Sequence, residues 1–375
     1  MFGSYPHLRL QLALGLVFAA VLATGATAGA WGSEGPLRPG GAASSADGPP
    51  TGTDAAARRW VAATADPWAA YYGPEQYAAM TEALDGRYAG VGLWVVRGGD
   101  GVVTVSRVRG DGPAARASVR AGERLLDIDG RPVTGLPVTE VVALLRGDSP
   151  LAGSSVTLAL RRGPVPHTVT LRRQLLDAQD VVVDQPAAGI TRIAVSAFTA
   201  GTGDLVEAAV HQSDDRRGRG ILLDLRGNSG GLVDESVEAA SSLLDGGPVG
   251  SYQADGSTTR LTAEPGGDTS VPVVVLVDGG TMSAAELLTG ALQDRGRAVV
   301  VGSQTFGKGA VQQATPLPGG AAVERTVGHY RTPDGRDLDG HGITPDVAVP
   351  PTDGPQAAER TAITVLDDLA GLGSR

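Results

Sequence analysis

The sequence predicts a multi-domain α/β protein, and three features of the chain support this prediction. Strand and helix patterns alternate through the C-terminal half, which favours a layer with at least partly parallel strands. A stretch from about residue 88 to 173 is rich in strand patterns, and a partly helical segment precedes it. The length of 375 residues is enough for two or three domains.

The N-terminus predicts an export segment. Arg9 precedes an apolar run over residues 10–23, and Ala26-Thr27-Ala28 matches a cleavage pattern of small residues. We therefore expect residues 1–30 to be a signal peptide or membrane anchor. Residues 31–53 are rich in Gly, Pro, Ala and Ser and predict a linker. The bulk of the protein is then expected to be extracytoplasmic, either secreted or anchored with its folded domains outside.

The rest of the chain divides into a helical segment, a β-rich module, an α/β layer and a last helix. We place these at residues 54–86, 87–174, 175–350 and 351–375. In the module, a turn at Asp129-Gly130 joins two strands, and an amphipathic helix follows. The layer is expected to contain strands at 221–225, 273–277 and 298–301 and helices at 233–244 and 283–293.

The composition excludes several classes of protein. Hydrophobic residues make up 42% of the chain and charged residues 19%, which is typical of a globular fold. The formal net charge of −10 argues against nucleic acid as a partner, because binding to phosphates needs a basic surface. The absence of cysteine excludes disulfides, thiolate nucleophiles and cysteine-ligated zinc.

The single lysine of the chain is a candidate general base. Of the 31 basic residues, 30 are arginine and one is Lys308. Arginine stays protonated in proteins, whereas lysine loses its proton more readily when it is buried or crowded. A lysine that persists in so arginine-rich a chain is therefore a candidate for a neutral amine that accepts a proton.

Ser283 is the candidate nucleophile. It follows the predicted strand at 273–277 and begins a predicted helix, where Glu286 completes the pattern of a capping box. The hydroxyl then lies at the positive end of the helix dipole, which stabilises developing negative charge. Lys308 follows 25 residues later, after one further strand, so we expect both residues at one edge of the layer. A hydroxyl and a neutral amine together make a Ser-Lys pair for acyl transfer.

A glycine-rich loop after the strand at 221–225 is a candidate oxyanion hole. Gly230 and Gly231 have no side chains to cover their N–H groups, so one of them can serve as a second oxyanion donor. The alternative is a tight turn without a chemical role.

Two other motifs point to different chemistry. The spacing from Gly302 to Lys308 matches a phosphate-binding loop, but Gly309 stands where a hydroxyl residue would hold Mg²⁺. His329 and His341 lie near glycines, but no G-x-S-x-G motif positions a serine for a Ser-His-Asp triad. We therefore expect neither a cofactor nor a metal.

Taken together, these motifs resemble the carboxyl-terminal processing (tail-specific) peptidases of the S41 type. The resemblance covers most of the chain and rests on Ile221–Val233, Ser283–Glu286, Thr305–Gln312, Asp66–Tyr71, Gly90–Leu93, Tyr330–Gly335 and Gly342–Asp346. It implies a crotonase- or ClpP-like protease core at 175–350 and a PDZ domain at 87–174.

The resemblance also implies roles for particular residues. Ser283 would be the nucleophile, Lys308 the general base, and Gln312, on the same helical or turn face, the residue that orients the lysine. Asp294 would be structural. The implied oxyanion donors and tail-binding residues are the backbone amides of Ala284 with Gly230 or Gly231, and Gly92 with Leu93 in the PDZ domain.

The resulting prediction is a serine endopeptidase. Its expected partners are protein or peptide substrates with exposed C-termini, which the PDZ domain would capture by adding them as a strand. Membrane contact is expected only through the N-terminal segment. A non-catalytic PDZ scaffold with a degenerate core is the main alternative. An enoyl-hydratase-like enzyme would have a similar core but would need an acyl-CoA site.

Overall fold

The computed structural model describes residues 53–98, 101–147, 152–214, 218–254 and 257–373. The expected export segment and all but the last residue of the linker lie outside these ranges. Of the helices in the described ranges, none is long and apolar enough to cross a membrane. The described chain forms two compact units, here called the β-rich unit (73–83 and 87–178) and the core unit (53–72, 84–86 and 179–373).

The β-rich unit is built on an antiparallel sheet. Its strand order is β3-β4-β5-β7-β8, with β6 beside β5, so β3 lies at one edge. Alternate residues of β7, including Val156 and Leu158, are fully buried and form the core with α5. The elements of this unit are α3 (Pro74–Leu84), β2 (Arg87–Gly90), β3 (Leu93–Arg97), β4 (Val103–Val108), α4 (Pro113–Arg116), β5 (Arg124–Ile128), β6 (Arg131–Pro132), α5 (Val138–Arg146), β7 (Ser155–Arg162), β8 (Val165–Arg172) and β9 (Gln174–Asp177).

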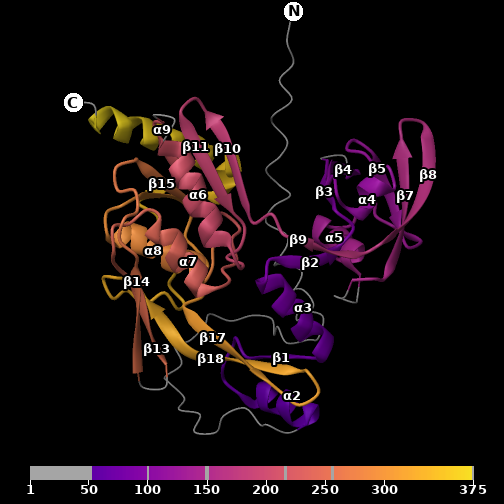
Figure 1. Ribbon diagram of the computed structural model, residues 1–375, viewed down its shortest axis with the longest axis horizontal. Coiled ribbons are helices and arrows are strands. Elements are labelled where there is room, and N and C mark those ends of the chain that lie inside the picture. Colours follow the sequence, from indigo (N-terminus) through magenta and orange to yellow (C-terminus); the bar gives the residue numbers. More distant parts are fainter. Residues whose placement is uncertain (1–52, 99–100, 148–151, 215–217, 255–256, 374–375) are drawn as a thin grey trace, which may run out of the picture. The chain divides into compact units, whose positions relative to one another are not determined.

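The main sheet of the core unit has helices on both faces (Figure 1). The strand order is β10-β11-β12-β15-β16-β19, parallel from β11 to β19 with β10 antiparallel at the edge. Its elements are β10 (Val181–Ala187), β11 (Ile190–Val195), α6 (Thr202–Asp214), β12 (Gly220–Asp224), α7 (Val233–Ser241), β15 (Val273–Val277), α8 (Ala284–Asp294), β16 (Val299–Gly302), β19 (Val347–Ala348), η1 (Pro351–Asp353) and α9 (Pro355–Gly373).

Alternation along the central strands explains the three layers. Leu223 and Val275 face the side covered by α6, α7 and α8, whereas Leu222 and Val274 face α9. Every residue of β12 and β15 is buried, as expected for strands with both faces covered. The predicted parallel layer and its three central strands are therefore confirmed.

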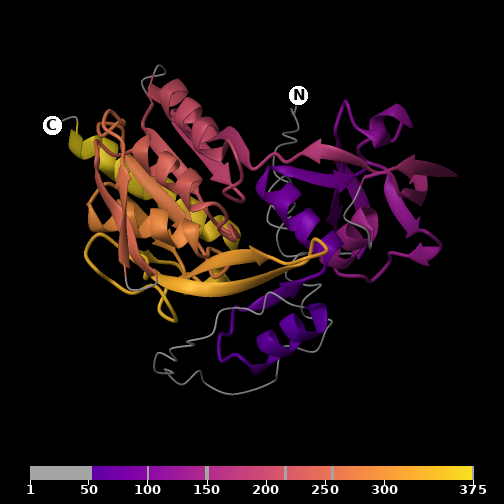
Figure 2. The same cartoon turned by 60° about the horizontal axis from the view of Figure 1, so that its bottom comes forward.

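A second sheet, which the sequence analysis did not predict, completes the core unit (Figure 2). It runs β1-β18-β13-β14, and β17 also pairs with β18. The helix α2 covers the tip of the β17–β18 hairpin through Ala57 and Trp60, which pack against Val323. The bounds are α2 (Asp54–Ala63), β1 (Ala70–Tyr72), β13 (Gly247–Ala254), β14 (Ser257–Ala263), β17 (Ala310–Pro316) and β18 (Ala322–Arg331).

Two details of the sequence analysis are corrected by these elements. The segment 54–86, expected to be partly helical, contains the helices α2 and α3 but also the strand β1, and it is shared between the two units. Gln312 lies within the strand β17, not on a helical or turn face. Local patterns missed both strands because each is defined by its pairing with β18, which is distant in sequence from β1 and follows β17 in a hairpin.

Candidate active site

Three loops meet at the carboxyl ends of the neighbouring strands β12, β15 and β16. Backbone hydrogen bonds join them: Met282 N–H donates to Asn228 O at 2.8 Å, and Phe306 N–H donates to Thr281 O at 3.1 Å. The loops carry the glycine pair, Ser283 and Lys308. Parallel strands end at the same edge of a sheet, so this gathering follows from the topology.

Ser283 occupies a strained position at the start of α8. Its φ of 54° and ψ of −118° lie in a region that non-glycine residues rarely adopt. Ser283 and Glu286 form a capping box, in which Ser283 N–H donates to Glu286 Oε2 at 2.9 Å. Such strain persists only where the surroundings enforce it, and here both the helix and the Glu286 carboxylate hold the serine backbone.

The buried carboxylate of Glu286 links Ser283 to the loop that carries Lys308. Besides Ser283 N–H, it accepts Lys308 N–H at 2.9 Å, Gly307 N–H at 2.7 Å and the Thr305 hydroxyl at 2.5 Å. Burial raises the pKa of Glu286, while these donors act in the opposite direction. Ser283 N and Lys308 N lie 2.9 Å from the same oxygen, so the two backbones are neighbours. Sequence reasoning identified Glu286 only as a cap.

The glycine pair packs directly on Ser283. A Cβ at Gly230 would lie 2.9 Å from Ser283 Cβ, and a Cβ at Gly231 would lie 2.2 Å from the Phe198 carbonyl oxygen. Only glycine fits at either position. Gly230 N–H already donates to Asn228 Oδ1 at 2.8 Å, so in this conformation Gly230 is not a free oxyanion donor.

Two backbone N–H groups near Ser283 remain without an acceptor in the described part of the chain, those of Gly231 and Ala284. Ala284 is the first residue of α8, where N–H groups have no partner within the helix. Of the expected oxyanion donors, the amides of Gly231 and Ala284 therefore remain candidates, and that of Gly230 does not.

Lys308 is half-buried, and its environment makes the loss of a proton easier than it is for a lysine in water. Its Nζ lies 5.2 Å from the centre of the Trp68 ring. Burial lowers the pKa of Lys308, and the nearby carboxylates of Glu324 and Asp66 oppose this shift. The hydrogen bonds of the described residues do not include one between the Ser283 hydroxyl and Lys308 Nζ, so the two residues are joined here through Glu286.

Gln312 contacts the N-terminal lead-in, which we define as residues 66–72. Its Nε2 donates to the Trp68 carbonyl oxygen at 2.8 Å. Trp68 also packs on Phe306, with ring centres 6.0 Å apart. Asp66 accepts hydrogen bonds from Thr326 N–H at 2.7 Å and from its hydroxyl at 2.9 Å. The lead-in thus forms one side of the site, a role that local sequence patterns did not reveal.

The comparison with known proteins identifies the family. The model described as peptidase family S41 matches residues 189–349, and a PDZ domain model matches residues 104–162. The C-terminal processing peptidase of Tetradesmus obliquus is 33% identical over 327 residues, which cover 79% of this chain and 68% of that protein. The chain belongs to peptidase family S41.

The chain is also similar to other proteases whose names describe carboxy-terminal processing. A carboxy-terminal-processing protease of Bartonella bacilliformis is 33% identical over 293 residues, which cover 76% of this chain and 66% of the relative. The chain thus spans about two thirds of the length of these curated relatives. The solved photosystem II D1 C-terminal processing protease is 30% identical, with a TM-score of 0.53, over 84% of this chain and 85% of that one.

In this S41 chain, an ion network supports the edge of the sheet that carries the three loops. Arg226 donates to Asp224, at the end of β12, at 2.8 Å. Arg226 and Arg192 also contact Glu359 of α9, at 3.4 Å and 3.1 Å. Asp294, expected to be structural, accepts a hydrogen bond from Asp334 N–H at 3.0 Å. These contacts hold α8 and α9 in place around the site.

The β-rich unit, which contains the residues matched by the PDZ model, presents β3 at the edge of its sheet. Gly92, just before β3, has a φ of 73°, and its carbonyl oxygen accepts Arg109 N–H at 2.8 Å. A Cβ at Gly92 would lie 3.2 Å from Gly112 Cα. The close packing fixes the loop that leads into the edge strand.

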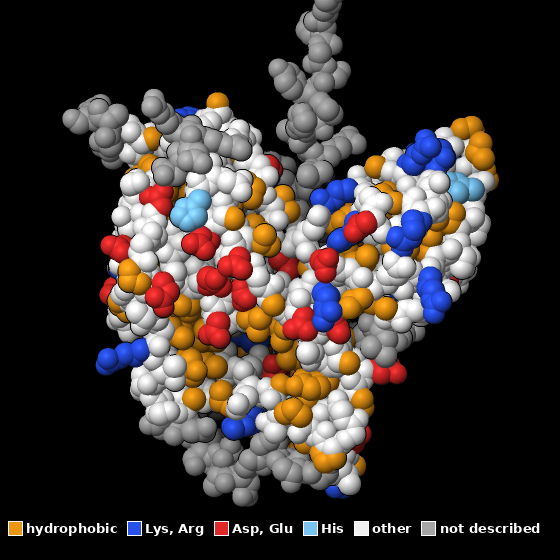
Figure 3. Space-filling view, viewed as in Figure 1, with side chains coloured by type: hydrophobic (Ala, Val, Ile, Leu, Met, Phe, Trp, Pro, Cys, Tyr) orange, Lys and Arg blue, Asp and Glu red, His pale blue; other side chains and the backbone are white. Residues whose placement is uncertain are grey.

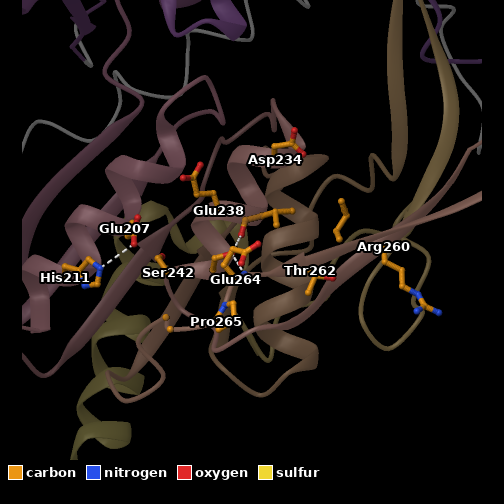
Figure 4. Close-up of a pocket in the computed structure, with 14 residues that line it drawn as sticks. Glu207, His211, Asp234, Glu238, Ser242, Arg260, Thr262, Glu264 and Pro265 are labelled. Atoms are coloured by element: carbon orange, nitrogen blue, oxygen red, sulfur yellow. Dashed lines mark hydrogen bonds and ion pairs between the residues drawn. The ribbon is translucent and has the colours of Figure 1, made fainter.

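A cavity of about 540 Å³ lies elsewhere on the core unit, between α6, α7 and β14 (Figure 4). Its polar lining includes Glu207, His211, Glu238 and Arg260, and neither Ser283 nor Lys308 is part of it. Acidic side chains gather over this face (Figure 3). Within the described ranges, no three His, Asp or Glu side chains are placed to hold a metal ion.

Proposed function

We propose that this S41 chain is a serine endopeptidase of the carboxy-terminal processing type, with Ser283 and Lys308 as its catalytic dyad. One observation carries the proposal: the buried Glu286 carboxylate holds the backbones of both residues beside the glycine pair. A nucleophile, a base and two amide donors then lie at one edge of the sheet, which is the set that acyl transfer requires.

The reaction begins with a change of side-chain torsions. Lys308 Nζ turns from Trp68 toward the Ser283 hydroxyl, while its backbone stays bonded to Glu286. The neutral amine takes the hydroxyl proton as Ser283 Oγ attacks the peptide carbonyl. The oxyanion accepts hydrogen bonds from Ala284 and Gly231, and the lysine ammonium returns the proton to the leaving amine. Water then hydrolyses the acyl-enzyme, again with Lys308 as the base.

Substrate capture is assigned to the PDZ domain. An extended C-terminal tail adds to the edge strand β3, and the amides near Gly92 and Leu93 receive the terminal carboxylate. The names of the relatives, which describe carboxy-terminal processing, support this assignment. The apolar run and small residues at 10–28 support export, so we propose that the reaction takes place outside the cytoplasm.

Casein hydrolysis by the wild-type protein and by Ser283→Ala tests this function. We expect the wild-type protein to release peptides and the variant to lose at least about a thousandfold of that rate, because no other hydroxyl replaces the nucleophile. Equal release by the two proteins would contradict the proposal and favour the peptide-binding scaffold.

A further inference from the structure

We infer that Glu324, held by Tyr72, is a positioning residue that supplies the counter-charge when Lys308 takes the proton of Ser283. The inference rests on the proposed Ser-Lys dyad and adds an acidic group to it. Glu324 belongs to β18, and Tyr72 belongs to the N-terminal lead-in. The lead-in would thus take part in catalysis, although it is far from the dyad in the sequence.

Strand pairing places Tyr72 and Glu324 together. In the antiparallel pairing of β1 with β18, Ala70 is opposite Glu324 and Tyr72 is opposite Ala322. The side chains of Tyr72 and Glu324 therefore share one face of the sheet. The Tyr72 hydroxyl donates to Glu324 Oε2 at 2.9 Å.

The same face also carries Gln312, which links the pair to the lysine. In β17, Gln312 is opposite Thr326, two residues after Glu324 on β18. Gln312 Nε2 holds the Trp68 carbonyl oxygen, and the Trp68 ring faces Lys308 Nζ at 5.2 Å. Lys308, Trp68, Gln312 and Glu324 therefore lie around one corner of the second sheet.

Three carboxylates interact with Lys308, Glu286 through the lysine backbone and Glu324 and Asp66 through charge, and they differ in how many hydrogen bonds they accept. Glu286 of α8 accepts four hydrogen bonds and holds the lysine backbone. Asp66 of the lead-in accepts two from Thr326 and one from Trp68 N–H. For Glu324, the hydrogen bonds of the described residues include only the one from Tyr72. Glu324 is the carboxylate with most capacity left to interact with an ammonium.

The negative charge of Glu324 matters at the step in which the proton moves from Ser283 to Lys308. As Ser283 Oγ attacks, its O–H bond breaks, an N–H bond forms on Lys308 and the carbonyl oxygen becomes negative. A half-buried ammonium is costly, and a nearby carboxylate offsets that cost, as the aspartate does in a Ser-His-Asp triad. Burial lowers the pKa of Lys308, and the charge of Glu324 opposes that shift. Burial also raises the pKa of Glu324, and the hydrogen bond from Tyr72 and the charge of Lys308 oppose that rise and so favour the ionised carboxylate.

The expected signature is a change in the pH profile. The rate at which Ser283 reacts should rise with pH as Lys308 loses its proton, and we call this rising part of the curve the acidic limb. In Glu324→Gln, the anion is lost and the pKa of Lys308 falls further, so the acidic limb moves to lower pH, by about one unit. The plateau rate falls about tenfold, because the ammonium formed in the reaction loses its counter-charge. Glu324→Asp keeps the charge and should restore the limb to near its wild-type position. Tyr72→Phe should shift it in the same direction as Glu324→Gln, but less.

The test measures the rate at which a fluorophosphonate probe modifies Ser283 in the full chain, as a function of pH from mildly acidic to alkaline solution. Glu264→Gln is the matched control, since it removes an exposed carboxylate from the same unit and should leave the profile unchanged. An unshifted acidic limb in Glu324→Gln, or no recovery in Glu324→Asp, overturns the inference alone. A wild-type protein that is unreactive at every pH overturns the proposed dyad, and the inference with it.

Discussion

Ser283 and Gly231 show how the site depends on backbone conformations that side chains disfavour. Ser283 keeps a φ of 54° without being glycine, and Gly231 has a φ of 136° against the Phe198 carbonyl. The strained backbone of Ser283 fixes the direction in which α8 begins. The missing side chain at Gly231 lets the glycine-rich loop pack closely against the Phe198 backbone. The two residues therefore set the distance between the hydroxyl and its proposed oxyanion donor.

Gly231→Ala should abolish modification of Ser283 by a fluorophosphonate probe. The new Cβ would lie 2.2 Å from the Phe198 oxygen, so the loop must shift, and the strained φ adds about 1–3 kcal/mol of destabilisation. Gly279→Ala is the control, because its Cβ would have no neighbour closer than 4.0 Å. Thermal unfolding separates loss of the site from loss of the fold. A Gly231→Ala protein that reacts as fast as Gly279→Ala would contradict this account of the loop.

Several of these residues were identifiable from the sequence alone. The excess of arginine singled out Lys308, and the capping pattern singled out Ser283. The engagement of Gly230 N–H by Asn228 was not predictable, because it depends on side-chain geometry within the folded loop. Nor was Glu324, whose partners lie far away in the sequence.

Among the elements, the helix α8 and the loop at 303–309 are held together by the Glu286 carboxylate. Its carboxylate accepts hydrogen bonds from Ser283 at the helix start and from Thr305, Gly307 and Lys308 in the loop. Hydrogen bonds to a buried charged group contribute about 1.5–3 kcal/mol each, so this junction is a strong one.

Glu286→Ala should separate the two elements. We expect a free energy of unfolding lower by about 3 kcal/mol or more, because buried N–H groups lose their acceptor. Casein hydrolysis should fall at least about a hundredfold, since Ser283 and Lys308 are no longer held together. Chemical denaturation and the hydrolysis assay measure the two effects, with the exposed Glu264→Ala as the control. Retained activity with lowered stability would show that the bridge is only structural.

The parallel layer was predictable because its strands are short, fully apolar runs, as at Val273–Val277, and the segments between them have a helical pattern of apolar residues. The second sheet was not predicted. The strand β14 has mostly exposed residues, and β1 has only three. These strands are defined by pairing with a neighbouring strand rather than by their own pattern, β1 with β18 and β14 with β13. The same holds for β17, which pairs with β18, and this is why Gln312 was placed on the wrong kind of element.

At the scale of the whole molecule, the chain joins a module proposed to bind substrate tails to a core proposed to carry the chemistry. The β-rich unit has its own hydrophobic core and an edge strand, while the core unit contains every residue of the proposed dyad and oxyanion hole. Binding and cleavage are therefore assigned to different units and should be separable by experiment.

A free C-terminal carboxylate on the substrate should be needed for binding by the PDZ domain. We expect the full-length Ser283→Ala protein to bind a peptide at least about tenfold more weakly when its C-terminus is amidated, a loss of about 1.4 kcal/mol. Fluorescence anisotropy with matched acid and amide peptides measures this difference. Equal affinities would show that the tail carboxylate is not recognised.

The neutral lysine is the central claim, and Lys308→Arg tests it most directly. Arginine keeps a positive charge and cannot accept the proton of Ser283. Mass spectrometry of peptides after fluorophosphonate treatment at neutral pH reports whether Ser283 carries the adduct. We predict a complete adduct in the wild-type protein and none in an equally stable Lys308→Arg protein. A Lys308→Arg protein modified at the wild-type rate would contradict the mechanism.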